Sequence, residues 1–292
     1  MIASADRGGV RRCVLLIVAS VVLSGCGGAV DASLIATAVQ NTEDAGGAEL
    51  VFEMEMELPG FSEPVVMTGN GVEDAGAQRG QLTFDMSGLA DLPGAGAICA
   101  DGCDLDVVAD GSSVYMRSKL FATGFGGKEW MKLNLERLGA GMGIPIATPE
   151  MAPPSASEQL RMLRAVSGDV TEHGREQVRG ADTTHYSATV DLRRTVESLP
   201  EPQREAALRG VEKLIAASGQ SEMPIDVWID DDERVRRFEM EQTMEQSGIR
   251  AKMHMTMEYV RFGVPVEIDV PDDDEVFDAT DIALQQLNQD IP

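Results

Sequence analysis

Cysteine is the residue type whose positions in this 292-residue chain most clearly point to chemistry. Cys26 ends a Leu-Ser-Gly-Cys sequence, and it follows an apolar run over residues 14–23 that comes after three arginines. A basic start, a short apolar run and small residues before a cysteine are typical of a bacterial lipoprotein signal peptide. The run is far shorter than the roughly 20 residues that cross a bilayer. We therefore expect residues 1–25 to be removed and Cys26 to carry lipid.

Lipid on Cys26 would decide where the protein is found. Each buried methylene of an acyl chain contributes roughly 0.8 kcal/mol, and two or more chains such as palmitate anchor a protein stably. We expect a lipid-anchored protein on the extracytoplasmic face of the cell membrane, with residues 26–30 as the tether and residues 31–292 as one folded domain. The alternative is an ordinary secretory signal in which Cys26 is incidental.

Two further cysteines, Cys99 and Cys103, are separated by a short segment that contains Gly102 and so permits a tight turn. An exported chain lies in an oxidising compartment, where such a pair is expected to form a disulfide. A zinc site is the less favoured alternative, because no second cysteine pair or nearby histidine completes a set of ligands.

Motifs for catalysis are missing from the sequence. It contains no Gly-x-Ser-x-Gly, His-Glu-x-x-His or phosphate-loop pattern. The three histidines, His173, His185 and His254, lie on separate expected elements, and no two have the spacing of metal ligands. The acidic runs 230–233 and 272–275 lack the spacing of a calcium loop. We expect no enzymatic activity, no cofactor and no metal site.

The chain is strongly acidic. Its formal net charge is −25, and removal of residues 1–25 takes away three arginines and one aspartate, which brings the charge to −27. Such a charge repels nucleic acid and anionic headgroups, so we expect neither as a broad electrostatic partner.

Methionine is the most unusual part of the composition, with sixteen residues, while aromatic residues make up only 4%. In three segments, around residues 54, 240 and 255, methionines alternate with charged residues, as in strands with one buried and one wet face. The apolar set is Phe52, Met54, Met56, Met240, Met244, Met253, Met255 and Met257, and the opposite set is Glu53, Glu55, Glu57, Glu239, Glu241, Glu245, Lys252, His254 and Glu258. Methionine suits surfaces that accept variable apolar ligands, so we expect the apolar set to line a ligand cavity. Ordinary core packing against helices is an equally weighted alternative.

Strands separated by Gly, Asp and Pro clusters dominate the order of expected elements. The expected strands are residues 50–58, 65–70, 81–86, 105–109, 113–117, 130–135, 178–190, 225–230, 235–246, 250–262 and 264–270. The expected helices are residues 31–41, 155–166, 192–199, 205–218 and 278–288, and the Gly- and Pro-rich residues 139–154 form a loop. Hairpin connections dominate, which indicates an α+β fold with a mostly antiparallel sheet.

Several strand and hairpin segments resemble those of a known family. They are residues 107–117 leading to 130–133, residues 178–186, and residues 223–230, together with Cys26 and the short helix after it. With these segments the chain resembles the mycobacterial-type LppX/LprG lipoproteins within the LolA/LolB-like superfamily of lipoprotein and lipid carriers. The resemblance covers nearly the whole chain after residue 25. It implies a strongly curved half-barrel with helices covering its concave face and a hydrophobic cavity for acyl chains. The acidity, the methionine content and residues 139–154 depart from that family.

These observations together predict a non-enzymatic carrier that binds a lipid or another amphiphile in the cell envelope. Its expected partners are the membrane, through the lipid anchor, the hydrophobic ligand, and a transport partner that the sequence does not name. A sensor or interaction module of the same fold is the alternative, and a surface protein whose cavity is filled by its own side chains is the third interpretation.

Overall fold

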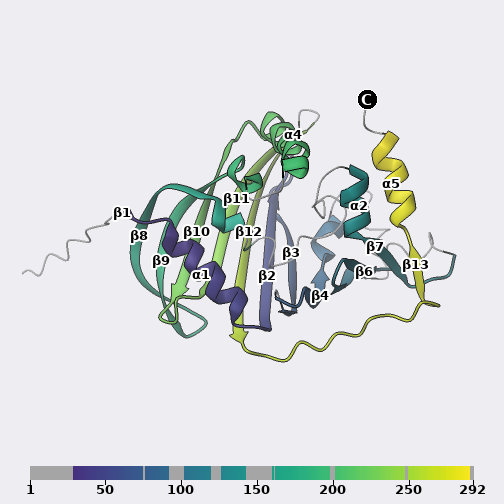
Figure 1. Cartoon of the computed structure of the whole chain (residues 1–292), viewed down its shortest axis with the longest axis horizontal. Coiled ribbons are helices and arrows are strands. Elements are labelled where there is room, and N and C mark those ends of the chain that lie inside the picture. The colour runs from purple at the N-terminus through teal and green to yellow at the C-terminus, as the bar shows by residue number, and fades with distance from the viewer. Residues whose placement is uncertain are drawn as a thin grey trace, which may run out of the picture.

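One large curved β-sheet forms the body of the protein (Figure 1). The computed structural model describes residues 29–74, 76–91, 102–119, 126–142, 160, 162–197, 201–246 and 249–289. Thirteen of the described segments pair in the order β1-β8-β9-β10-β11-β12-β2-β3-β4-β5-β6-β7-β13. Neighbouring described strands pair antiparallel, except β13, which lies parallel to β7. The expected α+β fold with a mostly antiparallel sheet is confirmed.

The strands are β1 (Ala29–Val30), β2 (Ala48–Glu57), β3 (Val65–Asp74), β4 (Arg79–Asp85), β5 (Asp104–Asp110), β6 (Ser113–Arg117), β7 (Trp130–Asn134), β8 (Val166–Val178), β9 (Ala181–Asp191), β10 (Glu222–Asp230), β11 (Val235–Gln246), β12 (Ile249–Phe262) and β13 (Val276–Asp278). The helices are α1 (Ser33–Asp44), α2 (Leu135–Met142), α4 (Glu201–Ser218) and α5 (Thr280–Gln289), with 3₁₀ turns η1 (Ser87–Asp91), η2 (Leu163–Ala165) and η3 (Arg194–Val196). Two meanders, β2 to β7 and β8 to β12, meet where β12 pairs with β2. The centre of the sheet therefore joins segments that are far apart in the sequence.

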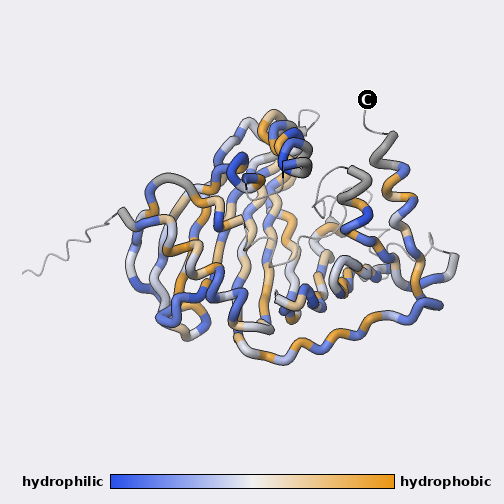
Figure 2. Tube along the Cα trace, viewed as in Figure 1, coloured by the Kyte–Doolittle hydropathy of each residue, from blue (hydrophilic) through white to orange (hydrophobic). Residues whose placement is uncertain are grey.

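Strand β2 shows how alternation gives the sheet two different faces. Leu50 and Phe52 are buried, whereas the next residue, Glu53, points to the opposite face of the strand and is exposed. We call the face that carries Phe52 the inner face and the face that carries Glu53 the outer face. The same alternation of hydrophilic and hydrophobic residues is visible along the neighbouring strands (Figure 2). Burial of one face in this way is the main source of stability for an antiparallel sheet.

Helix α1 packs on the inner face. Ile35, Ala38 and Val39 have no exposed surface and belong to the same apolar core as residues of β2 and β11. Thr42 fixes the end of the helix, because its Oγ1 donates to Ala38 O at 2.7 Å and accepts from Val235 N at 2.8 Å. Figure 1 shows α1 running across the strands from β8 towards β2. Coverage of the whole concave face by helices stays a prediction.

The helix expected over residues 155–166 is helical at Leu160 and Met162, and strand β8 begins where that segment ends. A short 3₁₀ turn, η2, follows Met162 and leads into β8 at Val166; the sequence predicts no element for most of β8. β8 lies near the edge of the sheet, because it pairs with β9 on one side and with only the two residues of β1 on the other. Most of its residues are polar, as is usual for a strand in this position. A strand near a sheet edge is largely solvated, so it lacks the apolar alternation by which strands are recognised. The helix expected over residues 192–199 is, in the described part, only the short 3₁₀ turn η3.

Residues 264–270 alternate like a strand but form no ladder with the described strands. The segment is extended, and its alternate residues are half-buried and exposed. Val264 N donates to Gly47 O at 3.0 Å, and Asp269 N donates to the side chain of Gln81 at 3.3 Å. The alternation arises because one side of this segment contacts the rest of the protein while the other side faces solvent. The prediction of a strand over residues 264–270 is therefore wrong.

The C-terminal segment returns to the other end of the sheet. β13 pairs with β7, and α5 packs against α2, where Arg137 Nη2 lies 2.6 Å from Asp281 Oδ1 (Figure 1). α2 occupies residues 135–142, so the loop expected over residues 139–154 begins later than predicted; its remainder lies outside the described residues.

Candidate functional site: the inner apolar face of the sheet

Strand pairing aligns the methionines of different segments into rows on the inner face. Met54 pairs with Met67 on one side and with Met255 on the other, and Met255 pairs with Met240. Directly paired residues of antiparallel strands point to the same face. A continuous row of four methionines therefore crosses β3, β2, β12 and β11, and Ile225 of β10 extends it.

The rows on either side of these methionines differ in burial. On one side, Phe52 pairs with Met257 and Met257 with Phe238; none of the three exposes more than 9% of its surface. On the other side, Met56 pairs with Met253 and both side chains are half-buried. The inner face thus changes from closed core to partly open apolar surface over two rows of residues.

The expected convergence of the methionine segments on one face of one sheet is found. Phe52, Met240, Met255 and Met257 are buried in the apolar core, and Met54, Met56 and Met253 are half-buried. Met244 pairs with Ala251 and keeps the register, but its side chain lies outside the described part. Whether these residues line a ligand cavity stays a prediction.

The outer face of the same strands is polar and tied together by ion pairs. Glu239 pairs with Thr256 and Thr256 with Glu53, so polar residues form a row on this side. Lys252 Nζ lies 2.8 Å from Glu241 Oε2, and Arg237 contacts both Glu239 and Glu258. Exposed pairs of this kind contribute little to stability, about 0–1 kcal/mol each, but they keep this face hydrated.

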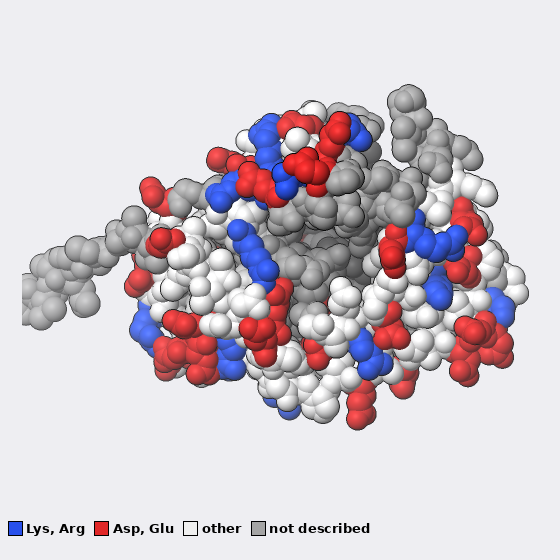
Figure 3. Space-filling view, viewed as in Figure 1, with Lys and Arg blue, Asp and Glu red and all other residues white. Residues whose placement is uncertain are grey.

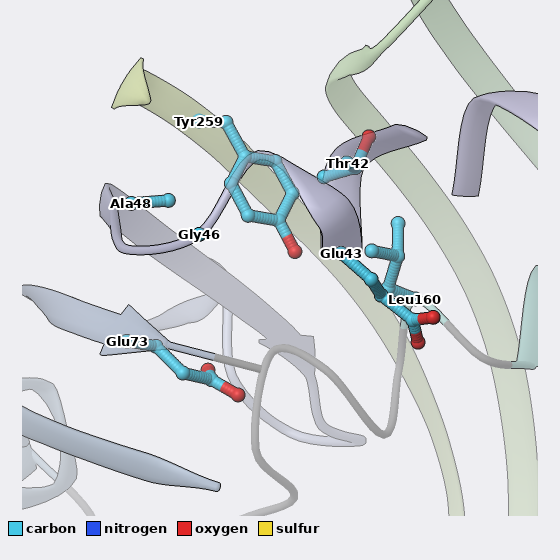
Figure 4. Close-up of a pocket in the computed structure, with 7 residues that line it drawn as sticks. All are labelled: Thr42, Glu43, Gly46, Ala48, Glu73, Leu160 and Tyr259. Carbon is cyan, nitrogen blue, oxygen red and sulfur yellow. The ribbon is translucent and has the colours of Figure 1, made fainter. Parts of the chain in front are cut away.

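A small pocket lies where α1 meets the strand ends (Figure 4). Its volume is about 10 Å³, and its lining consists of Thr42, Glu43, Gly46, Ala48, Glu73, Leu160 and Tyr259. This space fits about one water molecule and no larger ligand. Burial raises the pKa of the Tyr259 hydroxyl well above its ordinary value, and the charges of Glu73 and Glu43 add to the effect. The tyrosine therefore stays neutral and closes this end of the apolar face.

A wider, open hollow of about 460 Å³ lies beside the end of β12, and its walls are basic. The guanidinium groups of Arg234 and Arg236 stack over the ring of Phe262 at 4.7 and 4.6 Å. Asp230, which is buried, accepts from Arg236 Nε at 2.7 Å. The carboxylate of Asp230 offsets part of the positive charge, so the hollow is a weaker candidate for a binding site than the inner face. On the face seen in Figure 3, charged residues gather on α4 and along the lower edge of the molecule.

Of the three cysteines with a predicted lipidation or disulfide role, Cys103 lies within the described residues and the other two do not. Cys103 is buried and disulfide-bonded. Cys99 and Cys26 lie outside the described part, so the Cys99–Cys103 pairing, lipidation of Cys26 and removal of residues 1–25 stay predictions. Among the described residues, no helix combines the length and the apolar character that a bilayer span requires.

The structure brings together two histidines, His173 and His185, whose spacing along the chain matches no metal-binding motif. The ring centroids of His173 and His185 lie 4.7 Å apart on the outer face. Their distance along the chain hides this, because β8 and β9 form a hairpin in which residues 174 and 185 pair. The Arg179-Gly180 turn signals the hairpin but pairs residue 174 with residue 185, so a second signal, the bulge before Gly174, is needed to place His173 beside His185.

No protein-family model matches the sequence. A segment of 118 residues is 32% identical to an uncharacterized 31.2 kDa protein in the rplA-rplJ intergenic region of Streptomyces griseus, and it covers 37% of this chain and 36% of that protein. The match thus spans about a third of the length of this relative.

Three solved structures align with the chain over most of its length. Lipoprotein LppX of Mycobacterium tuberculosis is 12% identical with a TM-score of 0.43, covering 82% of this chain and 100% of LppX. LprF of Mycobacterium bovis is 14% identical with a TM-score of 0.42, covering 84% and 99%. A LolA superfamily protein of Nitrosomonas europaea is 9% identical with a TM-score of 0.29, covering 83% and 96%. The chain is thus similar to LppX-type lipoproteins and LolA-like proteins, as its sequence suggests, and we argue no function from that likeness.

Proposed function

We propose that this protein is a lipoprotein, anchored to the outer surface of a membrane through Cys26, that binds and carries an amphiphile in the cell envelope. The ligand's acyl chains lie on the inner face of the sheet. The observation that carries the proposal is the row Met67, Met54, Met255 and Met240, which crosses four adjacent strands on one face.

Methionine is suited to this task because its side chain is flexible and polarizable. Three rotatable bonds and a polarizable sulfur let it fit apolar surfaces of different shape. The half-buried residues Met54, Met56 and Met253 lie beside the closed core, so acyl chains that cover them would bury additional apolar surface at about 25 cal/mol per Å². The covering of the concave face by helices completes the enclosure.

Charge favours the same face for the ligand. The outer face carries glutamates on β2 and β11, and the chain has a formal net charge of −25. Apolar chains gain nothing from such a surface, and acidic headgroups are repelled by it. An anchor at Cys26 would keep the inner face within reach of the membrane from which an amphiphile is taken.

The test is to measure lipid carried by protein expressed without residues 1–25, with Cys26→Ala, and purified without detergent. Mass spectrometry of the organic extract is expected to show a bound amphiphile at a defined ratio to protein. An empty extract, combined with no uptake from vesicles, would indicate that the inner face is filled by the protein's own side chains.

Two neighbouring residues of β2 provide a matched pair of variants. Met56→Arg places a charge on the inner face, and Glu55→Arg places the same side chain on the outer face; both positions are half-buried. A charge without a partner among acyl chains costs several kcal/mol. We expect Met56→Arg to reduce bound lipid at least about tenfold and Glu55→Arg to leave it unchanged. Equal loss from both, with circular dichroism unaltered, would place the ligand elsewhere.

A further inference from the structure

A β-bulge brings His173 onto the outer face beside His185. The pairing of β8 with β9 shifts by one residue between Glu172 and Gly174, so His173 is the extra residue of β8. Such a bulge re-aims a side chain, and glycine is the residue that tolerates the backbone it requires. Gly174 has a φ of 115°, which side-chain-bearing residues rarely adopt. The local sequence is therefore suited to this arrangement.

Asp226 of β10 completes a group of three side chains that can bind a metal. Its Oδ1 lies 2.7 Å from His185 Nε2. The ligand atoms of His173, His185 and Asp226 all lie within 4.8 Å of one another. Nitrogen and carboxylate ligands bind zinc at about 2.0–2.2 Å, which places them roughly 3–3.5 Å apart around one ion. Small side-chain rotations would bring the three atoms to those separations.

Groups around His185 hold its ring as a metal ligand is usually held. Nδ1 of His185 lies 3.2 Å from Glu176 Oε1, and Glu176 Oε2 accepts from Trp228 Nε1 at 2.9 Å. The indole of Trp228 stacks on the imidazole with centroids 4.3 Å apart and planes 7° apart. In metal sites a ligating histidine generally donates its other nitrogen to a carboxylate, which fixes its tautomer and orientation. His185 therefore has Nδ1 directed at Glu176 and Nε2 directed at Asp226, and an ion between Nε2 and Asp226 Oδ1 would replace their 2.7 Å contact with two metal–ligand bonds.

We propose that His173, His185 and Asp226 form a binding site for a divalent transition-metal ion of the zinc and copper class. Two imidazoles and one carboxylate suit these ions, whereas calcium and magnesium prefer oxygen ligands. Three protein ligands leave a further coordination position for water or another small ligand. His173 is exposed and the other two residues are half-buried, so the site is open to solvent. Binding through His173 Nε2 replaces its 2.8 Å hydrogen bond with Ser187 Oγ.

The site lies on the face opposite the methionine rows. Ala188, Ile225 and Val227 point inward from the same strands that carry His185 and Asp226 on the outer face. It therefore stands apart from the proposed ligand face, near the β8 edge of the sheet (Figure 1). Loss of metal binding would leave the lipid proposal untouched, and the reverse also holds.

The experiment is calorimetric titration of Zn²⁺ and Cu²⁺ into chelator-treated protein without residues 1–25 or a histidine tag. We expect one ion per chain, and Cu²⁺ to quench the fluorescence of Trp228, which contacts His185. His173→Asn and His185→Gln are each expected to weaken binding at least about tenfold. Glu176→Gln, which keeps all three ligands, is expected to weaken it about 10–100-fold.

His254 is the matched control because it also lies on the outer face, with Nε2 3.8 Å from Glu239 Oε2. His254→Asn is expected to retain full affinity. His173 is exposed and its replacement is expected to leave the fold intact, which thermal unfolding verifies. No saturable binding by the unaltered protein would overturn the proposal and leave His185 as a bridge between Glu176 and Asp226. Equal affinity in the His173 and His254 variants would overturn it as well.

Discussion

Replacement of Thr42 by valine tests how firmly helix α1 is held on the inner face. Thr42 is 3% exposed, and its hydroxyl is shared between Ala38 O at 2.7 Å and Val235 N at 2.8 Å. Valine keeps the shape of the side chain but leaves the N–H of Val235, itself fully buried, without this acceptor. A buried donor left unsatisfied costs about 1–3 kcal/mol.

Urea denaturation, followed by circular dichroism, measures the effect of Thr42→Val. With a denaturant slope of about 3 kcal/mol/M, a loss of about 1–3 kcal/mol lowers the unfolding midpoint by roughly 0.3–1 M. The control is Thr256→Val on the outer face, where the hydroxyl lies 3.5 Å from His254 and is half-exposed. This control is expected to change the free energy of unfolding by less than about 0.5 kcal/mol. If the two variants unfold at the same urea concentration, the hydroxyl of Thr42 does not hold α1 on the sheet.

Three further predictions concern the anchor, the disulfide and alkaline stability. Cys26→Ala should move the protein from the membrane fraction to the soluble fraction, and persistence in the membrane would require another attachment. In unreduced, denatured protein, thiol labelling should modify neither Cys99 nor Cys103; labelling of both would rule out the disulfide. Because burial raises the pKa of Tyr259 well above 10, the free energy of unfolding should fall as the pH rises past about 10, where only the unfolded state ionises. Tyr259→Phe should show a smaller fall between about pH 9 and pH 11, and an identical fall would assign the loss to other groups.

Strands buried on one face could be predicted from the sequence, because every second side chain packs in the core and is therefore apolar. The sequence predicts strands over residues 50–58 and 235–246, within two residues of β2 and β11, and strand pairing places Met54, Met240 and Met255 in one row. β8 could not be found in this way, because a strand near a solvated edge has few apolar residues to alternate. Residues 264–270 give the opposite error: a strand is predicted where none forms, because one side of the segment contacts the protein without pairing with another strand.

The histidine pair shows what a linear reading of spacing misses. His173 and His185 are twelve positions apart, which matches no metal-binding motif, yet a hairpin turn at residues 179–180 and one extra residue in β8 place their rings side by side. Register depends on the turn and on bulges, and a shift of one residue exchanges the two faces of a strand. Without the bulge, His173 would pair with Tyr186, whose side chain is buried on the inner face.

Strand β10 carries residues of both proposed sites, and it places them on opposite faces of the sheet. Ile225 and Val227 point into the apolar core, while Asp226 and Trp228, the residues between and after them, belong to the outer cluster. Because adjacent residues of a strand point to opposite faces, a substitution at Asp226 changes the metal-binding group without entering the inner face. Asp226→Asn should therefore weaken Zn²⁺ binding while the amount of co-purified lipid stays the same. Simultaneous loss of both, in a variant that unfolds at the unaltered temperature, would mean that the two faces are coupled through β10 and that the sites do not act separately.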